Sequence, residues 1–566
     1  MLKDLPLWKT YPLLDKKLRD ELNVMSDAEI REAFSTDLSF GTGGLREIMG
    51  VGTNRLNIYT IRKATLGFAN FLINKFEGQF KGNLRAVVSY DTRNNSRLFA
   101  EESARVLASR GFDVFIFASF RPTPELSFAV RDLHAMAGIM ITASHNPPKY
   151  NGYKIYDEFG CQYVPSKVDP VIHEIESIES IFDLSPESFA TYVEQGKIFF
   201  ISEPFDLKYF SAIEKVSCQD VDKSKLKVIY TPLHGTGLVF GEKILKQRGF
   251  AVVSVPEQMV PDPDFRTVKS PNPEDPAAFS YAMSLGKKER AHILLATDPD
   301  ADRMGVAVYN GHEYVCLTGN QTGAIILDYL TQFKKRPENP CVVTTIVTSD
   351  LGIKISKANG IKTMQTLTGF KFIGEQIELM KTANQEFFFG YEESFGYLIS
   401  PAVRDKDSFQ ALLIICEIAA FYLAQGKTLL DHLNEIYQAH GFFGESLINI
   451  KLEGEDGLRK IDAIMDYFKK AAILNIAGLP VKAIEDYEDG TRKTTSGKKS
   501  KLALPRSPVL KFLFKDGGWV VFRPSGTEPK LKIYISIVGR SSDETNATIK
   551  NVESHIQQMM LERHLI

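Results

Sequence analysis

A serine stands just beyond a short apolar run, where its hydroxyl could act as a nucleophile. Residues 137–141 are typical of a short buried strand, and Pro147 and Pro148 must leave the sheet because proline cannot continue a ladder of hydrogen bonds. Ser144 therefore follows the C-terminal end of a strand, where α/β sheets place ligands. A solvated turn serine would show the same local pattern, so its assignment depends on other segments. We expect His145 to orient the loop rather than to act as a base.

Three aspartates alternate with other residues beyond a second apolar run. An extended backbone would point the carboxylates of Asp298, Asp300 and Asp302 to one side, and carboxylate oxygens suit Mg²⁺. An EF-hand also begins with alternating acids, but it requires glycine at its sixth position and glutamate at its twelfth, where this chain has Arg303 and Tyr309. A capping or turn cluster is the structural alternative. It is disfavoured because three carboxylates repel one another unless a cation or basic groups compensate.

Two further segments could hold a phosphorylated sugar. Residues 523–530 combine an arginine, two hydroxyls and a flexible glycine, as a phosphate cradle does, although Pro-Ser-Gly-Thr is also an ordinary turn. Residues 392–394 (Glu-Glu-Ser) offer acceptors and a donor for sugar hydroxyls, with a solvated acidic turn as the alternative. The glycine-rich loops at 40–46 and 368–371 are weak signals taken singly.

The composition of the 566-residue chain argues against several classes of function. Apolar residues at 44%, charged residues at 24% and a formal charge of -2 are ordinary for a globular protein and give no electrostatic footprint for nucleic acid. The five cysteines have neither paired nor metal-ligand spacing, which favours free thiols in a reducing cytosol. Residues 1–6 lack the apolar region of a secretory signal, and the apolar segment 409–424 is short for a bilayer, which needs about 20 residues. We expect a cytoplasmic protein in which 409–424 forms a buried helix.

Three stretches of the chain share a rhythm of short apolar strands separated by helical segments. The strands expected in these stretches are 86–90, 113–117 and 138–141, then 228–230, 251–255 and 293–295, then 342–346, 361–365 and 387–389. Alternating strands and helices form mostly parallel sheets, whose loops gather at the C-terminal ends of the strands. A fourth region differs, because strands 510–514, 519–522 and 531–537 follow one another directly, with a hairpin turn signal at 515–518. We expect residues 485–501 to form a mobile surface loop.

The predicted fold class is α/β. It comprises three similar mixed α/β domains with mostly parallel sheets and a C-terminal α+β domain with an antiparallel sheet, arranged around a central active-site cleft. The predicted domains are 1–205 with the serine, 206–315 with the aspartates, 316–435 for the sugar and 436–566 for the phosphate.

These segments, in this order, resemble the α-D-phosphohexomutase superfamily over nearly the whole chain. The matching loops are the serine loop 142–147, the metal loop 298–303, the sugar loop 392–396 and the phosphate loop 523–527, with further matches at 40–46, 151–155 and 404–407. Residues 40–46 and 267–274 are similar to the branch with bacterial α-phosphoglucomutases and animal phosphopentomutases. Glu47 stands where many relatives have glycine. Glu393 stands where mannose-accepting relatives often have methionine, which favours glucose phosphates.

The resemblance implies an intramolecular phosphotransferase, a phosphosugar mutase of the isomerase class. Ser144 would be carried as a phosphoserine and would bind one Mg²⁺ together with Asp298, Asp300 and Asp302. The implied catalytic residues are Ser144, Lys154 as general acid or base, Arg46 and His145. The implied substrate-binding residues are Arg303, Thr368, Gly369, Lys371, Glu392, Ser394, Arg523, Ser525, Gly526 and Thr527.

The expected reaction interconverts glucose 1-phosphate and glucose 6-phosphate through glucose 1,6-bisphosphate, which also serves as activator. Phosphopentomutase, phosphomannomutase and glucose 1,6-bisphosphate synthase activities stay open as alternatives, as does a serine-dependent metal phosphatase from another class. A non-catalytic sensor would be expected to lose Ser144 or an aspartate, and all are present. The expected partners are small sugar phosphates, with no nucleic acid and no membrane, and the chain is expected to be a monomer or weak dimer.

Overall fold

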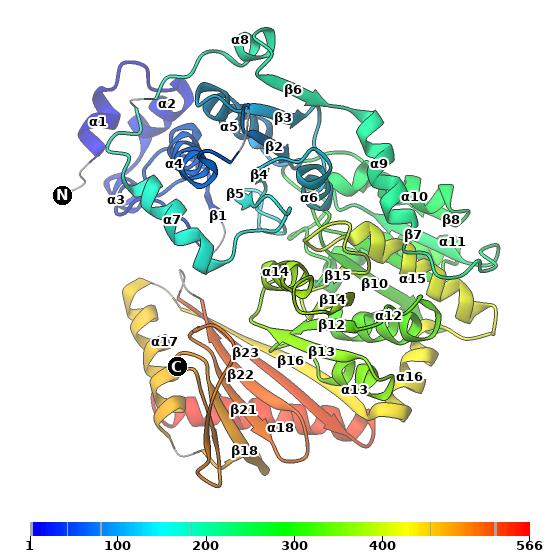
Figure 1. The fold of residues 1–566 in the computed structure, drawn as a ribbon. Coiled ribbons are helices and arrows are strands. Elements are labelled where there is room, and N and C mark those ends of the chain that lie inside the picture. The colour runs from blue at the N-terminus through cyan, green and yellow to red at the C-terminus, as the bar shows by residue number, and fades with distance from the viewer. Residues whose placement is uncertain are drawn as a thin grey trace. The chain divides into compact units, whose positions relative to one another are not determined.

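A computed structural model describes residues 4–41, 44–79, 82–182, 184–452, 454–471, 473–525 and 529–565. The chain forms two compact units (Figure 1). The first unit contains residues 1–322, 333–340 and 370–429, and the second contains residues 323–332, 341–369 and 430–566. The serine and aspartate loops both belong to the first unit.

The first unit begins with a six-stranded mixed sheet in the order β1-β5-β4-β2-β3-β6. Its strands are β1 (Gly44–Ile48), β2 (Arg85–Tyr90), β3 (Asp113–Phe117), β4 (Ala137–Ile141), β5 (Tyr150–Tyr156) and β6 (Ile198–Ile201). Strands β4, β2, β3 and β6 are parallel, whereas β5 and β1 continue the sheet in antiparallel pairing. Ser144 therefore follows the C-terminal end of β4, as predicted.

Helices cover both faces of this sheet. The helices of this part of the chain are α1 (Leu5–Thr10), α2 (Lys16–Val24), α3 (Asp27–Ala33), α4 (Ile58–Phe76), α5 (Ser96–Ser109), α6 (Thr123–Asp132), α7 (Pro165–Glu176), α8 (Phe189–Glu194) and α9 (Glu203–Glu214). Of these, α1, α2 and α3 contribute to a separate apolar cluster around Trp8. Phe68 of α4 and Leu107 of α5 belong to the core on the side of Val88, and Leu126 of α6 packs on the side of Val87. Burial on alternate sides is expected, because successive strand residues point to opposite faces.

A five-stranded sheet in the order β11-β10-β9-β7-β8 follows. Its strands are β7 (Lys227–Thr231), β8 (Ala251–Ser254), β9 (Ile293–Thr297), β10 (Met304–Tyr309) and β11 (Tyr314–Cys316), and its α-helices are α10 (Gly241–Gln247) and α11 (Ser280–Glu289). Strands β9, β7 and β8 are parallel, and β10 and β11 are antiparallel additions. Asp298 directly follows β9.

The remainder of the first unit carries the sugar loop and a buried helix. Its elements are α14 (Phe370–Met380), the antiparallel pair β14 (Glu386–Glu392) and β15 (Gly396–Leu398), and α15 (Ser408–Leu423). Nearly every residue of α15 is buried, and Asp407 caps it by accepting from two backbone N–H groups. The expected buried helix is thus confirmed. No helix in the described part of the chain is long and apolar enough to cross a membrane, and the five cysteines are free.

The second unit contains an antiparallel sheet with the main strand order β16-β23-β22-β21-β18-β19-β20, and β17 pairs with β18. Its strands are β16 (Phe442–Lys451), β17 (Asn475–Ile476), β18 (Leu479–Asp486), β19 (Thr491–Thr494), β20 (Lys499–Lys501), β21 (Leu510–Phe514), β22 (Trp519–Pro524) and β23 (Lys530–Gly539). Helices α17 (Gly454–Lys470) and α18 (Ser542–Leu561) pack on it through Phe468 and Val552. The other elements of the third repeat and its connection are α12 (Gly319–Phe333), the parallel pair β12 (Pro340–Thr345) and β13 (Lys362–Thr366), α13 (Leu351–Ala358) and α16 (Leu429–His440).

The predicted α/β class is confirmed for the individual sheets, including the antiparallel C-terminal sheet. The hairpin turn at 515–518 joins β21 and β22, with positive φ at Gly517 and Gly518. The mobile loop expected at 485–501 is wrong, because β19 and β20 form a hairpin that extends the sheet beyond β18. The lysines and threonines of this segment suggested a loop, but a polar edge strand has the same composition.

Candidate active site

Ser144 lies in a left-handed turn directly after β4. Its φ is 50° and only 3% of the residue is exposed. Its Oγ donates to Oδ2 of Asp298 at 2.9 Å and lies 3.2 Å from Nδ1 of His145. Its backbone N–H donates to Oγ1 of Thr142 at 2.8 Å. Positive φ is uncommon outside glycine, so the turn is a specific arrangement that brings the hydroxyl against the acidic loop.

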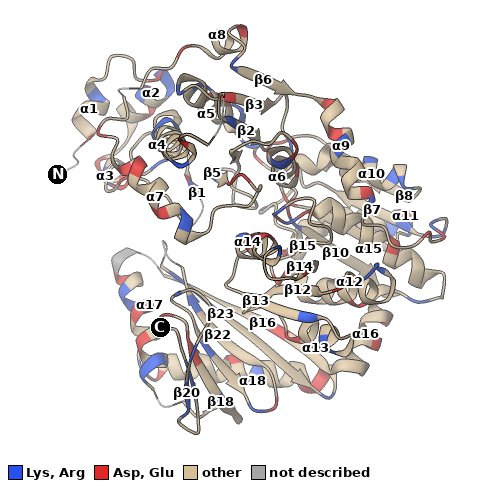
Figure 2. Ribbon diagram, in the orientation of Figure 1, with Lys and Arg blue, Asp and Glu red and all other residues tan. Residues whose placement is uncertain are grey.

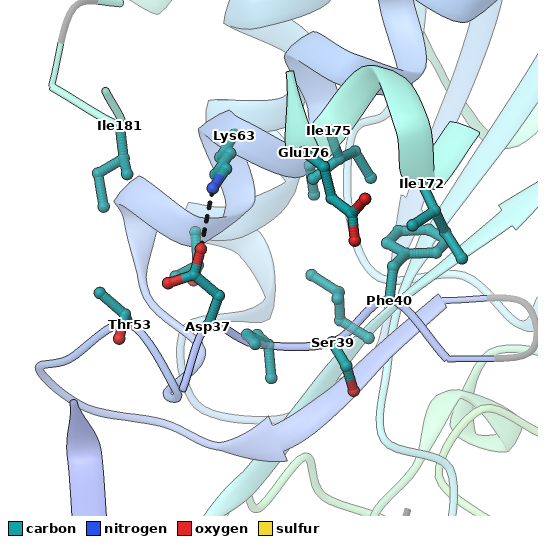
Figure 3. A pocket seen from close by; sticks show the side chains of 13 residues that line it. Asp37, Ser39, Phe40, Thr53, Lys63, Ile172, Ile175, Glu176 and Ile181 are labelled. Carbon is teal, nitrogen blue, oxygen red and sulfur yellow. Dashed lines mark hydrogen bonds and ion pairs between the residues drawn. The ribbon is translucent and has the colours of Figure 1, made fainter. Parts of the chain in front are cut away.

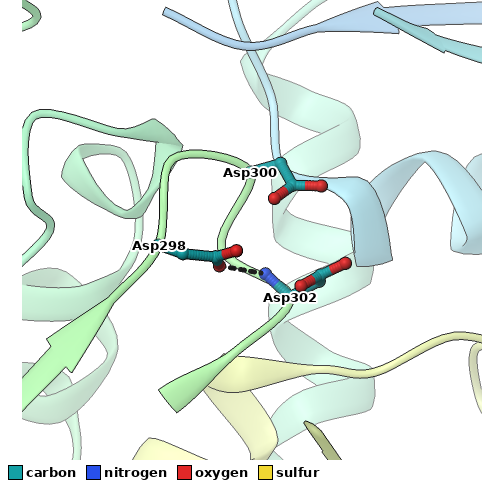
Figure 4. A group of neighbouring side chains, drawn as sticks. All are labelled: Asp298, Asp300 and Asp302. Carbon is teal, nitrogen blue, oxygen red and sulfur yellow. Dashed lines mark hydrogen bonds between the residues drawn. The ribbon is translucent and has the colours of Figure 1, made fainter. Parts of the chain in front are cut away.

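The three aspartates converge at a tight turn after β9 (Figure 4). One ligand atom from each of them lies within 4.8 Å of the others, and all three residues are buried. The extended backbone predicted for this loop is wrong, because Ala301 has a φ of 50° and its N–H donates to the carbonyl of Asp298. Oδ1 of Asp298 accepts from the N–H groups of Asp302 and Arg303, at 3.1 Å each. The turn itself therefore gathers the carboxylates.

Two buried lysines compensate the charge of this cluster. Lys154 Nζ donates to Oδ2 of Asp300 at 2.8 Å and lies 3.6 Å from Oδ2 of Asp302. Lys406 Nζ lies 2.9 Å from Oδ2 of Asp302 and 3.0 Å from Oδ1 of Asp405. Burial and the two neighbouring carboxylates raise the pKa of Asp298 well above its usual value. Burial would also raise the pKa of Asp300, but Lys154 outweighs it and the pKa is lowered.

The aspartates also leave oxygens available for a cation. Oδ1 of Asp300 and Oδ1 of Asp302 are buried, and neither has a hydrogen-bond partner in the part of the chain that the structure describes. Oδ2 of Asp300 is held by Lys154 and by Oγ1 of Thr123 at 2.8 Å. Buried acceptors without partners are costly, and hard carboxylate oxygens are the ligands that Mg²⁺ prefers. The donor set therefore fits a hard divalent cation.

The other predicted catalytic residues lie on neighbouring strands or beside the serine. Lys154 is on β5, opposite Met140 of β4, and Arg46 is on β1, opposite Gly152 of β5. The Arg46 guanidinium donates to Oδ1 of Asn146 at 3.4 Å, which brings it to the serine loop. Burial and the cations Arg303 and Arg46 lower the pKa of His145 well below its usual value. This shift in pKa favours the neutral form of the His145 ring beside Ser144.

The sugar-loop residues stand at the end of β14. Ser394 Oγ donates to Oε1 of Glu392 at 3.0 Å, whereas Oε2 of Glu392 is buried and has no hydrogen-bond partner within the described ranges. Burial raises the pKa of Glu392. Arg303 forms an ion pair with Glu274, and its backbone bridges Gly396 in the same loop. Lys371 is the second residue of α14. The serine, metal and sugar loops therefore all contribute to the first unit.

Six further predicted positions belong to the second unit. Thr368 has a buried Oγ1 with no hydrogen-bond partner among the described residues, and Gly369 has a φ of 118°. Arg523 lies near the end of β22, and the N–H of Ser525 donates to the carbonyl of Lys530 at 2.8 Å. The sixth and last of these predictions, Thr527, lies outside the described residues together with Gly526.

Four family models match the chain in succession. They are the phosphoglucomutase/phosphomannomutase α/β/α domain I at residues 37–182, domain II at 207–311, domain III at 318–440 and the C-terminal domain at 447–552. The chain belongs to the phosphoglucomutase/phosphomannomutase family. The resemblance to the α-D-phosphohexomutase superfamily is thereby confirmed.

Sequence relatives and solved structures extend this result. A phosphoglucomutase of Staphylococcus saprophyticus is 36% identical over 532 residues, covering 93% of this chain and 95% of the relative. A phosphoglucomutase of Staphylococcus aureus is 39% identical over 515 residues, covering 90% and 92%. The structure of a putative phosphomannomutase from Thermus thermophilus has a TM-score of 0.68 at 23% identity, covering 92% of this chain and 99% of that chain. The open form of pp63/parafusin from Paramecium has a TM-score of 0.66 at 19% identity, covering 94% and 96%. Both structures share the family fold.

Arg93, which lies against the serine loop, was not identified from the sequence. Arg93 is 3% exposed and lies just beyond β2. Its guanidinium donates to four backbone carbonyls, those of Ser144, Asn146 and Pro147 in the serine loop and that of Tyr150 at the start of β5. Arg93 also pairs with Asp91, whose Oδ2 lies 3.2 Å from Nε. The carbonyls of the loop are thus gathered around one buried cation.

Asp91 links this arginine to the turn that holds Ser144. Its Oδ2 accepts from Oγ1 of Thr142 at 2.6 Å, and its Oδ1 accepts from Oγ of Ser96 at 2.6 Å. Thr142 in turn accepts from the N–H of Ser144. The polar triplet 91–93 directly follows an apolar strand, as the polar residues of the other loops do. This pattern could have identified the segment from the sequence.

A separate cavity of about 380 Å³ lies on the other side of β1 (Figure 3). Phe40 and Leu45 line it, whereas Arg46, the next residue, reaches the serine loop. Its main polar feature is the ion pair between Lys63 and Asp37 at 3.2 Å. None of the predicted site residues that the structure describes lines this cavity.

Proposed function

We propose that this chain interconverts glucose 1-phosphate and glucose 6-phosphate through a phosphoserine at Ser144 and a glucose 1,6-bisphosphate intermediate. The observation that carries the proposal is the hydrogen bond from Ser144 Oγ to Asp298 within a buried acidic cluster that two lysines compensate. The phosphoglucomutases that are 36–39% identical support glucose phosphate as substrate. The chain would therefore be an intramolecular phosphotransferase.

In this proposal, Ser144 alternates between a free and a phosphorylated side chain. The phosphoserine gives its phosphoryl group to the sugar, and the bisphosphate turns over and returns the other phosphoryl group to the serine. Phosphoryl transfer depends chiefly on alignment and on stabilisation of the charged oxygens. Arg93 and Asp91 fix the loop, and Lys154 and Lys406 keep cations at the reaction centre. We propose Lys154 as the group that exchanges a proton with the reacting sugar hydroxyl.

We propose that Asp298, Asp300 and Asp302, with an oxygen of the phosphoserine, hold one Mg²⁺. When bound, the ion would neutralise charge on the transferred phosphoryl group. The carboxylate oxygens without partners on Asp300 and Asp302 support this assignment. A merely structural turn cluster would not leave such acceptors buried.

The remaining predicted residues would hold the sugar and its second phosphate. We propose that Glu392, Ser394 and Lys371 bind sugar hydroxyls, and that Arg303 and Arg46 position phosphate. The proposed grip on the phosphate that is not transferred consists of Thr368, Gly369, Arg523, Ser525, Gly526 and Thr527. We also propose that the domain boundaries lie at residues 205, 315 and 435. A cytoplasmic location of the protein is likewise a proposal.

The experiment compares kcat/KM for glucose, mannose and ribose 1-phosphates, with the matching bisphosphate supplied. We expect glucose 1-phosphate to give the highest value. A preference for ribose or mannose would identify a phosphopentomutase or phosphomannomutase. Net formation of glucose 1,6-bisphosphate from another phosphate donor would identify a synthase. Release of inorganic phosphate at the rate of turnover would instead indicate a metal phosphatase.

A further inference from the structure

Thr123 makes two hydrogen bonds to Asp300, which lies 177 residues further along the chain. Its backbone N–H donates to the carbonyl of Asp300 at 3.0 Å, and its Oγ1 donates to Oδ2 of the same residue at 2.8 Å. Thr123 is the first residue of α6 and is 0% exposed. The N–H groups of a first helical turn have no partner within their helix, so this one can bind another loop. One residue therefore holds both the main chain and the side chain of Asp300.

The segment before α6 is anchored to the sheet that carries Ser144. The N–H of Arg121 donates to the carbonyl of Tyr90 at the end of β2, at 3.1 Å. The hydroxyl of Ser89, also on β2, donates to the carbonyl of Arg121 at 3.0 Å. Strand β2 pairs with β4, which leads to Ser144. Thr123 therefore connects the aspartate loop to the strands that present the serine.

The two oxygens of the Asp300 carboxylate have different surroundings. Oδ2 accepts from Thr123 and from Nζ of Lys154, each at 2.8 Å. A carboxylate oxygen has about two lone pairs, so these two donors occupy Oδ2. Oδ1 is buried and receives no hydrogen bond from the residues that the structure describes. Lysines and arginines are spread over the whole first unit (Figure 2), so the difference comes from two specific contacts and not from a basic surface.

We propose that Thr123 is a positioning residue for the cation site, whose hydroxyl holds Oδ2 of Asp300 and leaves Oδ1 for the cation. This inference rests on the proposed function, since it assumes that Asp298, Asp300 and Asp302 hold Mg²⁺. With Lys154 as its one donor, the carboxylate could turn about its side-chain bonds. A second donor on a helix restricts that rotation. Replacing residues that orient metal ligands typically changes metal affinity by about 10–100-fold.

Other contacts should keep the loop in place when the hydroxyl is removed. The backbone N–H of Thr123 remains in any variant at this position. Ser408, the first residue of α15, donates from Oγ to the carbonyl of Ala301 at 2.6 Å. The N–H of Ala301 donates to the carbonyl of Asp298 within the turn. Thr123→Val therefore tests the hydroxyl and not the position of the loop.

The test measures Mn²⁺ binding to the metal-free full chain, from the electron paramagnetic resonance signal of the free ion. All variants are compared at the same phosphorylation of Ser144, verified by mass spectrometry. Thr123→Val should raise the Kd for Mn²⁺ by about tenfold or more. Thr123→Ser keeps the hydroxyl and should keep the wild-type Kd. Thr65→Val is the matched control, because Thr65 is also 0% exposed and its Oγ1 donates to the carbonyl of Ile61 within α4.

The outcomes separate this inference from the proposed function. A wild type that binds no Mn²⁺ would refute the metal site itself, and the role of Thr123 with it. If wild type binds Mn²⁺ and Thr123→Val binds it equally well, the metal site stands and the role of Thr123 is refuted. Equal weakening in Thr123→Ser or in Thr65→Val would also refute that role, because the effect would not depend on this hydroxyl. Thr123→Ala removes the same hydroxyl and replaces Thr123→Val if the latter does not fold.

Discussion

Arg93→Lys is expected to slow phosphoryl transfer more than it destabilises the fold. Arg93 makes five contacts: three with carbonyls of the serine loop, one with the carbonyl of Tyr150 at the start of β5, and one with Asp91. A lysine has three donors on a single atom, so at least two of these contacts are lost. Hydrogen bonds to charged groups contribute about 1.5–3 kcal/mol each, which amounts to about 3–6 kcal/mol if the loop stays in place.

The serine loop is expected to rearrange in Arg93→Lys, so the loss of folding stability should be smaller than this full value of about 3–6 kcal/mol. Its carbonyls would turn toward water, and Ser144 would shift with them. A displacement of about 1 Å at a reacting group reduces the rate by about 100-fold. We therefore expect kcat to fall by about that factor. KM should change less, because Arg93 lies beneath the serine loop and not among the sugar-loop residues.

The assay measures initial rates with glucose 1-phosphate and its bisphosphate, together with thermal melting. Arg97→Lys is the matched control, since Arg97 pairs with Glu101 on the surface and is 69% exposed at its side chain. Such a pair contributes little, so the control should keep its activity. An unchanged kcat in Arg93→Lys would refute the positioning role. A loss of activity explained fully by unfolded protein would refute it as well.

The remaining predictions concern the metal loop, the phosphate loop and a buried acid. Asp300→Asn should reduce kcat by about 100-fold or more, since it removes a charge from the proposed cation site, and a normal rate at saturating Mg²⁺ would reject that site. Arg523→Ala should raise KM for glucose 1-phosphate by about tenfold or more, as expected for a charged phosphate contact; unchanged kinetics would exclude the contact. Burial raises the pKa of Asp157 to about 6, so its contribution to stability is present below about pH 4 and is lost as the pH rises through 6. Asp157→Asn should therefore gain melting temperature relative to wild type between pH 4 and 7, and an unchanged difference would contradict the raised pKa.

The buried strands and the loops that follow them could be predicted because each depends on a local pattern. Apolar runs mark the buried strands, and polar residues directly after them mark Ser144, Asp298 and Glu392. The backbone of the metal loop could not be predicted, because alternation suggested an extended segment. The left-handed turn at Ala301 is accompanied by hydrogen bonds that Oδ1 of Asp298 accepts from N–H groups four and five positions further along the chain.

The supporting contacts were less accessible to the sequence. Arg93 and Ser144 are 51 residues apart, and their contact depends on the parallel pairing of β2 with β4. Lys406 was noted only as part of a matching segment, yet it compensates Asp302 directly. Neither sequence segment contains a local pattern that indicates which distant loop its side chain contacts. Composition was similarly ambiguous at 485–501, where edge strands contain the same residue types as a loop.

The most direct test of the account is to follow the phosphate carried by Ser144. The protein would be incubated with labelled glucose 1,6-bisphosphate, and the peptide containing Ser144 would be analysed by mass spectrometry before and after a chase with unlabelled glucose 1-phosphate. We predict one phosphate at Ser144, which the chase transfers to sugar bisphosphate and glucose 6-phosphate with little free phosphate, and none in Ser144→Ala. No label at Ser144, or its release as inorganic phosphate during the chase, would contradict the central claim.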